Sequence, residues 1–227
     1  MFTRTMLGFC IAMAGIPTNA PAQSNRTKDL SSGSFLVAQR DSPDPNFAET
    51  VVLLVDYGEK GAMGLIINRQ TRVPLSRIFA EMKEAKDRSD KAYLGGPVSR
   101  TGVLALLRSS TKPEDAQHVF ADIHLISSKA LLEKTLESGA DATKLHVYLG
   151  YSGWGGGQLD REVELGVWHI FRADANMVFD PDPESVWTRM IRRAEMQIAS
   201  SPWIDWPYYS WRNATTGSTL TARVAGM

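Results

Sequence analysis

The residues best placed for chemistry lie in "LGYSGWGGGQLDREVELG", residues 149–166. Ser152 stands in Gly-Tyr-Ser-Gly-Trp, close to the G-x-S-x-G pattern in which small residues let a nucleophilic serine occupy a strained turn. Trp154 takes the place of the second glycine, and no histidine has a persuasive carboxylate partner in the sequence. We therefore interpret Ser152 as part of a glycine-rich turn and keep a Ser152-dependent hydrolase, with His169 as a candidate base, as an alternative.

Phosphate and metal sites are poorly supported. A phosphate loop requires G-K-[ST] after its glycines, whereas this chain has Gly157-Gln158-Leu159 and then acidic residues at the start of the expected helix. No H-x-x-x-H, H-E-x-x-H or cysteine pair is present. Asp180, Asp182 and Glu184 suit a helix start better than a metal site, because prolines separate them. The sequence predicts no metal, no cofactor and no catalytic residue.

Charge argues against a nucleic-acid-binding protein. The 227 residues carry 25 basic and 25 acidic side chains, so no global field attracts an anionic polymer. Arg189, Arg192 and Arg193 share one face of the last expected helix and could contact phosphates. Acidic neighbours and the absence of interleaved aromatic residues favour a solvated face instead.

The N-terminus predicts export. Arg4 precedes an apolar run over residues 6–16, and Ala20 and Ala22 form an A-x-A cleavage site. Residues 1–22 are therefore interpreted as a signal peptide, too short to span a membrane, so the mature chain has no transmembrane helix. The only cysteine, Cys10, would be removed with it. We expect an exported, periplasmic protein; the alternative is a cytoplasmic protein whose N-terminus is misread.

The rest of the chain reads as one α+β domain, residues 34–200, with a mixed, largely antiparallel sheet. A flexible lead-in, 23–33, precedes it. Helices are expected from Pro74, after a cap at Ser127 or Ser128, after the glycine-rich turn, and from Asp182-Pro183. The expected strands are 34–39, 50–56, 62–68, "AYLGG", "GVLALLRS", 145–149, "VWHIF" and "ANMVF".

A C-terminal tail, residues 201–227, is rich in aromatic residues. Such side chains either cover an apolar surface of the domain or contact a protein or envelope partner. The sequence leaves both readings open. The residues concerned are Trp203, Trp206, Tyr208, Tyr209 and Trp211.

Four motifs, in order over about residues 34–193, resemble the YqgE/AlgH family. They are "FLVAQRDSPDPNFAETVVLLVDYGEKGAMGLIINR", "YLGGPV", "LGYSGWGGGQLDREV" and "FDPDPESVW". The resemblance implies an α+β fold with a bifurcated or barrel-like sheet flanked by helices. It implies no established enzymatic activity; the family is described as a putative transcriptional regulator, named for a link to alginate production in some members.

These observations predict a non-enzymatic, exported binding or accessory protein. The alternatives are a cytosolic YqgE/AlgH-type regulatory protein and the Ser152-dependent hydrolase. Glycine-rich segments let backbone approach a ligand, so a pocket is expected where three of them meet. Its predicted residues are Gly64, Asn68, Gly95, Gly96, Pro97, Tyr151, Trp154 and Gln158, with the Gln158 amide available to the turn backbone or to a ligand.

Overall fold

The computed structural model describes residues 27–199, which form ten strands, five α-helices and two short 3-10 helices. The strands are β1 (Ser34–Ala38), β2 (Val51–Gly58), β3 (Gly61–Ile66), β4 (Gln70–Pro74), β5 (Lys91–Leu94), β6 (Val98–Arg108), β7 (Gln117–Phe120), β8 (Ile123–Ile126), β9 (Leu145–Gly155) and β10 (Trp168–Arg172). The helices are η1 (Thr27–Asp29), α1 (Leu75–Ile78), η2 (Lys83–Ala85), α2 (Lys129–Glu137), α3 (Gln158–Glu164), α4 (Ala175–Val178) and α5 (Pro183–Ala199).

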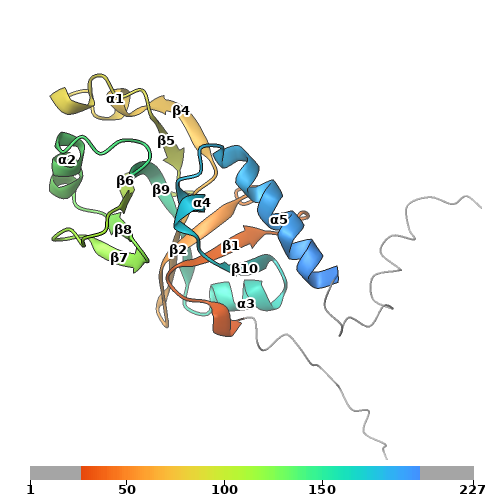
Figure 1. The fold of residues 1–227 in the computed structure, drawn as a ribbon. Helices are drawn as coiled ribbons and strands as arrows, with labels where there is room; N and C mark the ends of the chain where they lie inside the picture. The colour runs from red at the N-terminus through yellow and green to blue at the C-terminus, as the bar shows by residue number, and fades with distance from the viewer. Residues whose placement is uncertain (1–26, 200–227) are drawn as a thin grey trace, which may run out of the picture.

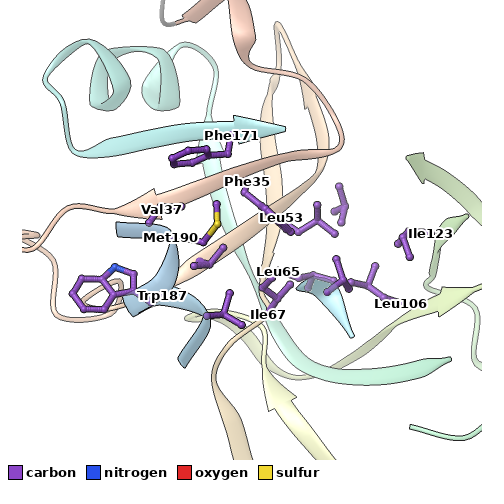
Figure 2. Packing of buried hydrophobic residues seen from close by; sticks show 14 of the residues in the cluster. Phe35, Val37, Leu53, Leu65, Ile67, Leu106, Ile123, Phe171, Trp187 and Met190 are labelled. Atoms are coloured by element: carbon purple, nitrogen blue, oxygen red, sulfur yellow. The ribbon is translucent and has the colours of Figure 1, made fainter. Parts of the chain in front are cut away.

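Strands β1 and β2 are buried on both faces. Side chains alternate along a strand, so Phe35 faces one core, shared with α5, while Leu36 faces another, shared with α3. Figure 1 shows α5 beside β1, and Figure 2 shows Trp187 and Met190 of α5 close to Val37. Strands covered on both faces read as continuous apolar runs, which explains why the sequence indicated them clearly.

The long strand β9 divides the sheet. Its first half pairs in parallel with β5 and antiparallel with β6, and its second half pairs antiparallel with β3. The sheet order is β10-β1-β2-β3-β9-β6-β8-β7, with β4 attached through β5, and the sheet curls into a half-barrel (Figure 1). The predicted α+β fold with a mixed, largely antiparallel, bifurcated sheet is therefore confirmed.

Several local predictions are wrong. The glycine-rich turn expected after residue 149 continues as strand β9 to Gly155. The segment "ANMVF" contains helix α4 rather than a strand, because the Asp174 side chain accepts from the Asn176 N–H and caps a helical turn. The β4 strand and the β7–β8 hairpin were not predicted, because each strand is only four or five residues long and β4 and β7 bury few side chains.

Residues 27–33, the described part of the predicted lead-in, pack against the domain. Leu30 is buried against the core under α3, and the Gly33 carbonyl accepts from the Ala173 N–H. Predictions for the signal peptide and for the aromatic tail concern residues outside the described range. Across residues 27–199, none of the helices combines the length and the apolar character that crossing a membrane requires.

Candidate functional site

The glycines of the predicted pocket lie where the chain crosses itself. A Cβ at Gly95 would lie 2.3 Å from the Gly150 carbonyl oxygen, and one at Gly96 would lie 2.3 Å from the Tyr151 carbonyl oxygen. A Cβ at Gly64 would similarly meet the backbone and side chains of β2. The structure thus brings the three glycine-rich segments together, as expected. The space that the glycines leave is nevertheless filled by the protein itself.

Ser152, opposite Gly64 in the sheet, is fully buried, and its Oγ donates to the Gly95 carbonyl oxygen at 3.1 Å. A nucleophile must reach its substrate, so this position favours a structural role. Tyr151 is half-buried and packs against the core under α5, and Pro97 is also half-buried. The ligand pocket predicted at these residues stays a prediction.

Asn68 is a buried connector rather than a surface group. Its Oδ1 accepts from the Val51 N–H at 2.8 Å, and its Nδ2 donates to the Glu49 carbonyl oxygen at 3.0 Å. Glu49 has a φ of 55°, which a non-glycine residue adopts only when neighbouring contacts hold it. Asn68 therefore fixes the entry of the chain into β2.

Two other predicted pocket residues, Trp154 and Gln158, belong to a group that we call the Glu162 cluster. The indole N–H groups of Trp154 and Trp168 both donate to Oε2 of Glu162 at 2.9 Å, and Gln158 Nε2 donates to Oε1 at 2.9 Å. Phe47 stacks on Trp154 and meets Trp168 edge-on. The cluster attaches α3 to β9 and β10, and its polar atoms already have partners.

Charged residues near α5 are likewise engaged. Asp180 accepts from the Asp182 N–H at 2.9 Å and from Arg189 at 2.6 Å, and the Arg193 guanidinium lies 5.4 Å from the Phe171 ring centre. Among residues 27–199, no three His, Cys, Asp or Glu side chains are grouped to hold a metal ion. The acidic residues therefore act in part as a helix-start motif, in line with the interpretation from sequence.

A different group has unsatisfied polar atoms. We call it the His146 cluster: Gln70, Tyr93, His146, Tyr148 and Phe179. His146 and Tyr148 share one face of β9, and Tyr93 lies opposite Tyr148 on β5. The imidazole lies between two rings, with centroids 4.5 Å from Tyr93 and 4.5 Å from Phe179.

The hydrogen bonds of this cluster are incomplete. Gln70 Nε2 donates to the Tyr93 hydroxyl at 3.3 Å, and that hydroxyl lies 3.5 Å from His146 Nε2. His146 Nδ1 and the Tyr148 hydroxyl are buried and make no hydrogen bond of regular geometry among residues 27–199, although the backbone of Ala142 and Val178 interacts with the imidazole. His146 is only 7% exposed and Tyr148 is fully buried. Most buried polar side-chain atoms in proteins have a partner, so two orphans in one cluster require an explanation.

Burial keeps the imidazole neutral. It lowers the pKa of His146 to about 4, while hydrogen bonding to the Ala142 backbone, the Asp90 carboxylate and hydrogen bonding to the Val178 backbone oppose this shift more weakly. Burial also raises the pKa of Tyr93. At neutral pH, His146 therefore has one ring nitrogen that donates and one that accepts. Such a low pKa makes it a weak general base, so the arrangement suits binding better than proton transfer.

A cavity of about 210 Å³ opens beside this cluster. Its lining combines aromatic, charged and small polar groups: Gln70, Ser89, Asp90, Lys91, Tyr93, Ala142, Leu145 and His146. Two larger grooves, of about 680 Å³ and 1020 Å³, are lined mainly by charged and small polar side chains. Neither contains one of the buried atoms without a partner. The His146 cavity is therefore the candidate site.

The sequence contains little indication of this site. His146 lies inside the expected strand 145–149 and, like the other histidines, has no persuasive carboxylate partner in the sequence. One signal was available: a histidine two residues before Tyr148 must share its face of a strand that is otherwise apolar. The position of Tyr93, 53 residues earlier in the chain, could only come from the fold.

Comparison with known proteins adds family information. Residues 35–199 match the family model described as AlgH-like. A UPF0301 protein of Streptomyces avermitilis is 34% identical over 176 residues, covering 74% of this chain and 88% of that protein. The solution structure of the AlgH protein from Pseudomonas aeruginosa matches with a TM-score of 0.60 and 27% identity, covering 77% of this chain and 95% of that one. A crystal structure of a Corynebacterium diphtheriae protein shares the fold, with a TM-score of 0.57, 20% identity, and 72% and 87% of the two chains covered.

Proposed function

Because the chain belongs to the AlgH-like family, whose relatives above carry names that assign no reaction, we propose that it is a non-enzymatic, exported binding protein. Its ligand site is the His146 cavity. The observation that carries the proposal is the cavity itself, of about 210 Å³, which opens beside an almost fully buried imidazole held between the rings of Tyr93 and Phe179.

The rigidity of the cavity wall supports a binding role for this site. The surrounding rings hold the imidazole from both sides, so the group is positioned before a ligand binds. A site arranged in advance in this way binds with little loss of side-chain freedom.

Export is supported by the sequence alone, through Arg4, the apolar run over residues 6–16 and the small residues Ala20 and Ala22. The alternative is a cytosolic AlgH-type regulatory protein. The burial of the Ser152 hydroxyl and its hydrogen bond to a backbone carbonyl argue against the Ser152-dependent hydrolase.

The location is tested by fractionating the native host and determining the N-terminus of the protein by mass spectrometry. A mature chain beginning at Gln23 outside the cytoplasm is expected. An intact Met1 in the cytosol would instead favour the regulatory alternative.

The binding role is tested by NMR of the full chain with labelled histidines and a library of small polar fragments. Signals of the His146 ring should move with at least one fragment, while those of His118, exposed on β7, stay in place. A library that never moves the His146 signals would reject the cavity as the site.

A further inference from the structure

The half-barrel leaves a groove between the two ends of its sheet. Strands β10 and β7 stand at opposite ends of the sheet order. Both nevertheless line the groove of about 1020 Å³, with residues 170–172 on one side and residues 120–122 on the other. A Cβ at Gly33, just before β1, would lie 2.7 Å from the Cβ of Phe120, at the end of β7. The groove therefore occupies the open side of the curled sheet.

The outer edge of β10 directs backbone groups toward this groove. The Ala173 N–H donates to the Gly33 carbonyl oxygen at 2.9 Å, in the register that pairs β1 with β10. Bonded residues alternate along an antiparallel pair, so the odd-numbered residues of β10 bond to β1. The backbone N–H and C=O groups of Ile170 and Arg172 then point to the other side, where no strand among residues 27–199 pairs with β10.

This edge has few of the features that usually prevent a further strand from pairing. Sheet edges in proteins are commonly protected by lysine, proline or a bulge. The sequence of β10, "WHIFR", contains neither lysine nor proline, and its register with β1 is regular. Phe120, Ile170 and Phe171, all at least partly buried, supply apolar wall beside it. The groove therefore suits an extended segment with one apolar face.

The described chain ends beside the same groove. Arg193 and Gln197 of α5 line it, and the Arg193 guanidinium lies 5.4 Å from the centre of the Phe171 ring. Helix α5 ends at Ala199, less than one turn after Gln197. Residues 200–217 can span up to about 60 Å at ~3.3 Å per residue, well beyond the roughly 17 Å length of a five-residue strand. Any part of the tail after residue 217 can therefore reach β10.

The sequence of the tail selects one segment. Proline cannot donate a hydrogen bond to a strand ladder, which disfavours the stretch that contains Pro202 and Pro207. Residues 218–224, "STLTARV", contain no proline and are rich in β-branched residues. Leu220, Ala222 and Val224 alternate with polar residues, the pattern typical of a strand with one apolar face.

We propose that residues 218–224 of the chain's own tail pair with the outer edge of β10 and close the open side of the half-barrel. Attachment to α5 raises the local concentration of the segment at the groove, so a single short strand is enough for binding. The inference gives the tail an intramolecular partner, which is one of the two readings that the sequence leaves open. It concerns a different part of the molecule from the His146 cavity and does not depend on the proposed ligand site.

Amide hydrogen exchange of the full chain, followed by NMR, tests the pairing residue by residue. The Ile170 and Arg172 amides should exchange slowly, because each donates to the added strand. Replacing both Thr221 and Ala222 by proline removes a donor whichever register the strand adopts, and should speed the exchange of these two amides at least tenfold. The Phe171 amide, which is bonded to β1, should stay protected.

The matched control replaces both Thr215 and Thr216 by proline, outside the proposed strand, and should leave all three exchange rates unchanged. Circular dichroism and the protection of Phe171 establish that each variant is folded.

Two results would overturn the proposal. The first is that Ile170 and Arg172 exchange at the same rate in the wild-type protein and in the Thr221→Pro, Ala222→Pro variant. The second is protection that increases with protein concentration together with a dimer by light scattering, since the segment would then pair with a second copy of the chain. Neither result bears on the His146 cavity, which the fragment library tests separately.

Discussion

The Glu162 cluster and the His146 cluster are built from similar side chains but differ in how many of their polar atoms have hydrogen-bond partners. Each places aromatic rings around a polar group and ties a segment to β9. In the first, the carboxylate receives two indole N–H groups and one amide. In the second, a buried imidazole nitrogen and a buried phenol make no regular hydrogen bond. Similar side chains thus have all their hydrogen bonds satisfied in one cluster and leave buried polar atoms without regular hydrogen bonds in the other.

The contrast between the two clusters shows which property of a buried polar group indicates a candidate site. Trp154 and Gln158 were predicted to line a pocket because they follow a glycine-rich stretch, yet their polar atoms are occupied. His146, which the sequence gives little reason to select, is one of three residues in the described chain, with His124 and Tyr148, that have a buried polar atom without a regular hydrogen bond. Whether the hydrogen bonds of the polar groups are satisfied, rather than which residue types are present, separates a structural cluster from a candidate site.

The largest effect is expected from Glu162→Ala. Two indole N–H groups, on Trp154 and Trp168, would lose their acceptor, and the free energy of unfolding should fall by about 4 kcal/mol. Urea unfolding followed by tryptophan fluorescence measures the loss. Glu164→Ala, an exposed acid on the same helix, is the matched control and should change stability by less than about 0.5 kcal/mol. Equal effects of the two substitutions would remove the distinction between the clusters.

The next effect concerns pH and His146. Its pKa falls from the ordinary 6.5 to about 4 in the folded chain, chiefly through burial. Between these values the unfolded state binds a proton that the folded state does not, so stability declines as pH falls from about 6.5 to 4. Relative to His146→Phe, the wild-type protein should lose about 3 kcal/mol over that range.

Urea unfolding at pH 7, 5.5 and 4 measures this difference. His118→Phe leaves the buried imidazole in place and should keep the wild-type slope. Other groups also titrate here, including Glu195, whose pKa is lowered by Arg40, so the comparison between variants is the informative quantity. Parallel curves for wild type and His146→Phe would show that the imidazole is not buried in its neutral form.

A smaller loss is expected from Gln158→Ala. The side chain accepts from the Gly155 N–H at 3.1 Å and donates to Glu162 at 2.9 Å, so its amide serves the backbone, one of the two roles anticipated from sequence. Because the site is exposed, the loss should be about 1 kcal/mol by urea unfolding. A change as large as that of Glu162→Ala would mean that the amide, rather than the indoles, dominates the cluster.

Sequence reasoning succeeded where local pattern determines structure. The apolar spacing of Trp187, Ile191 and Ala194 predicted α5, and the cap at Ser128 predicted α2. Sequence reasoning failed at β9. Its glycines remain in a strand because the Gly95–Gly96 corner packs directly against the β9 backbone there. That crossing depends on contacts between residues far apart in the chain, which no local pattern encodes.

Sequence reasoning missed the candidate site for the same reason. His146 and Tyr148 were visible as neighbours on one strand face, but their surroundings come from β4, β5 and the residue after α4. A histidine inside a strand is usually a satisfied core residue, and only the fold shows that Tyr93 serves Nε2 while Nδ1 makes no regular hydrogen bond. The missing information is which buried polar atoms have hydrogen-bond partners, and only a three-dimensional structure supplies it.

The smallest effect on the free energy of unfolding is expected from Tyr148→Phe, and it is the only substitution here expected to increase stability. The Tyr148 hydroxyl is buried without a partner in the described chain, so its removal should raise the free energy of unfolding by about 0.5 kcal/mol. The matched control is Tyr57→Phe, because the Tyr57 hydroxyl donates to Asp160 Oδ1 at 2.7 Å beside the Glu162 cluster. That substitution should lower stability by about 1 kcal/mol. Urea unfolding of both variants compares the removal of a tyrosine hydroxyl that has a hydrogen-bond partner with the removal of one that has none. A loss of stability in both variants would mean that the Tyr148 hydroxyl has a hydrogen-bond partner after all.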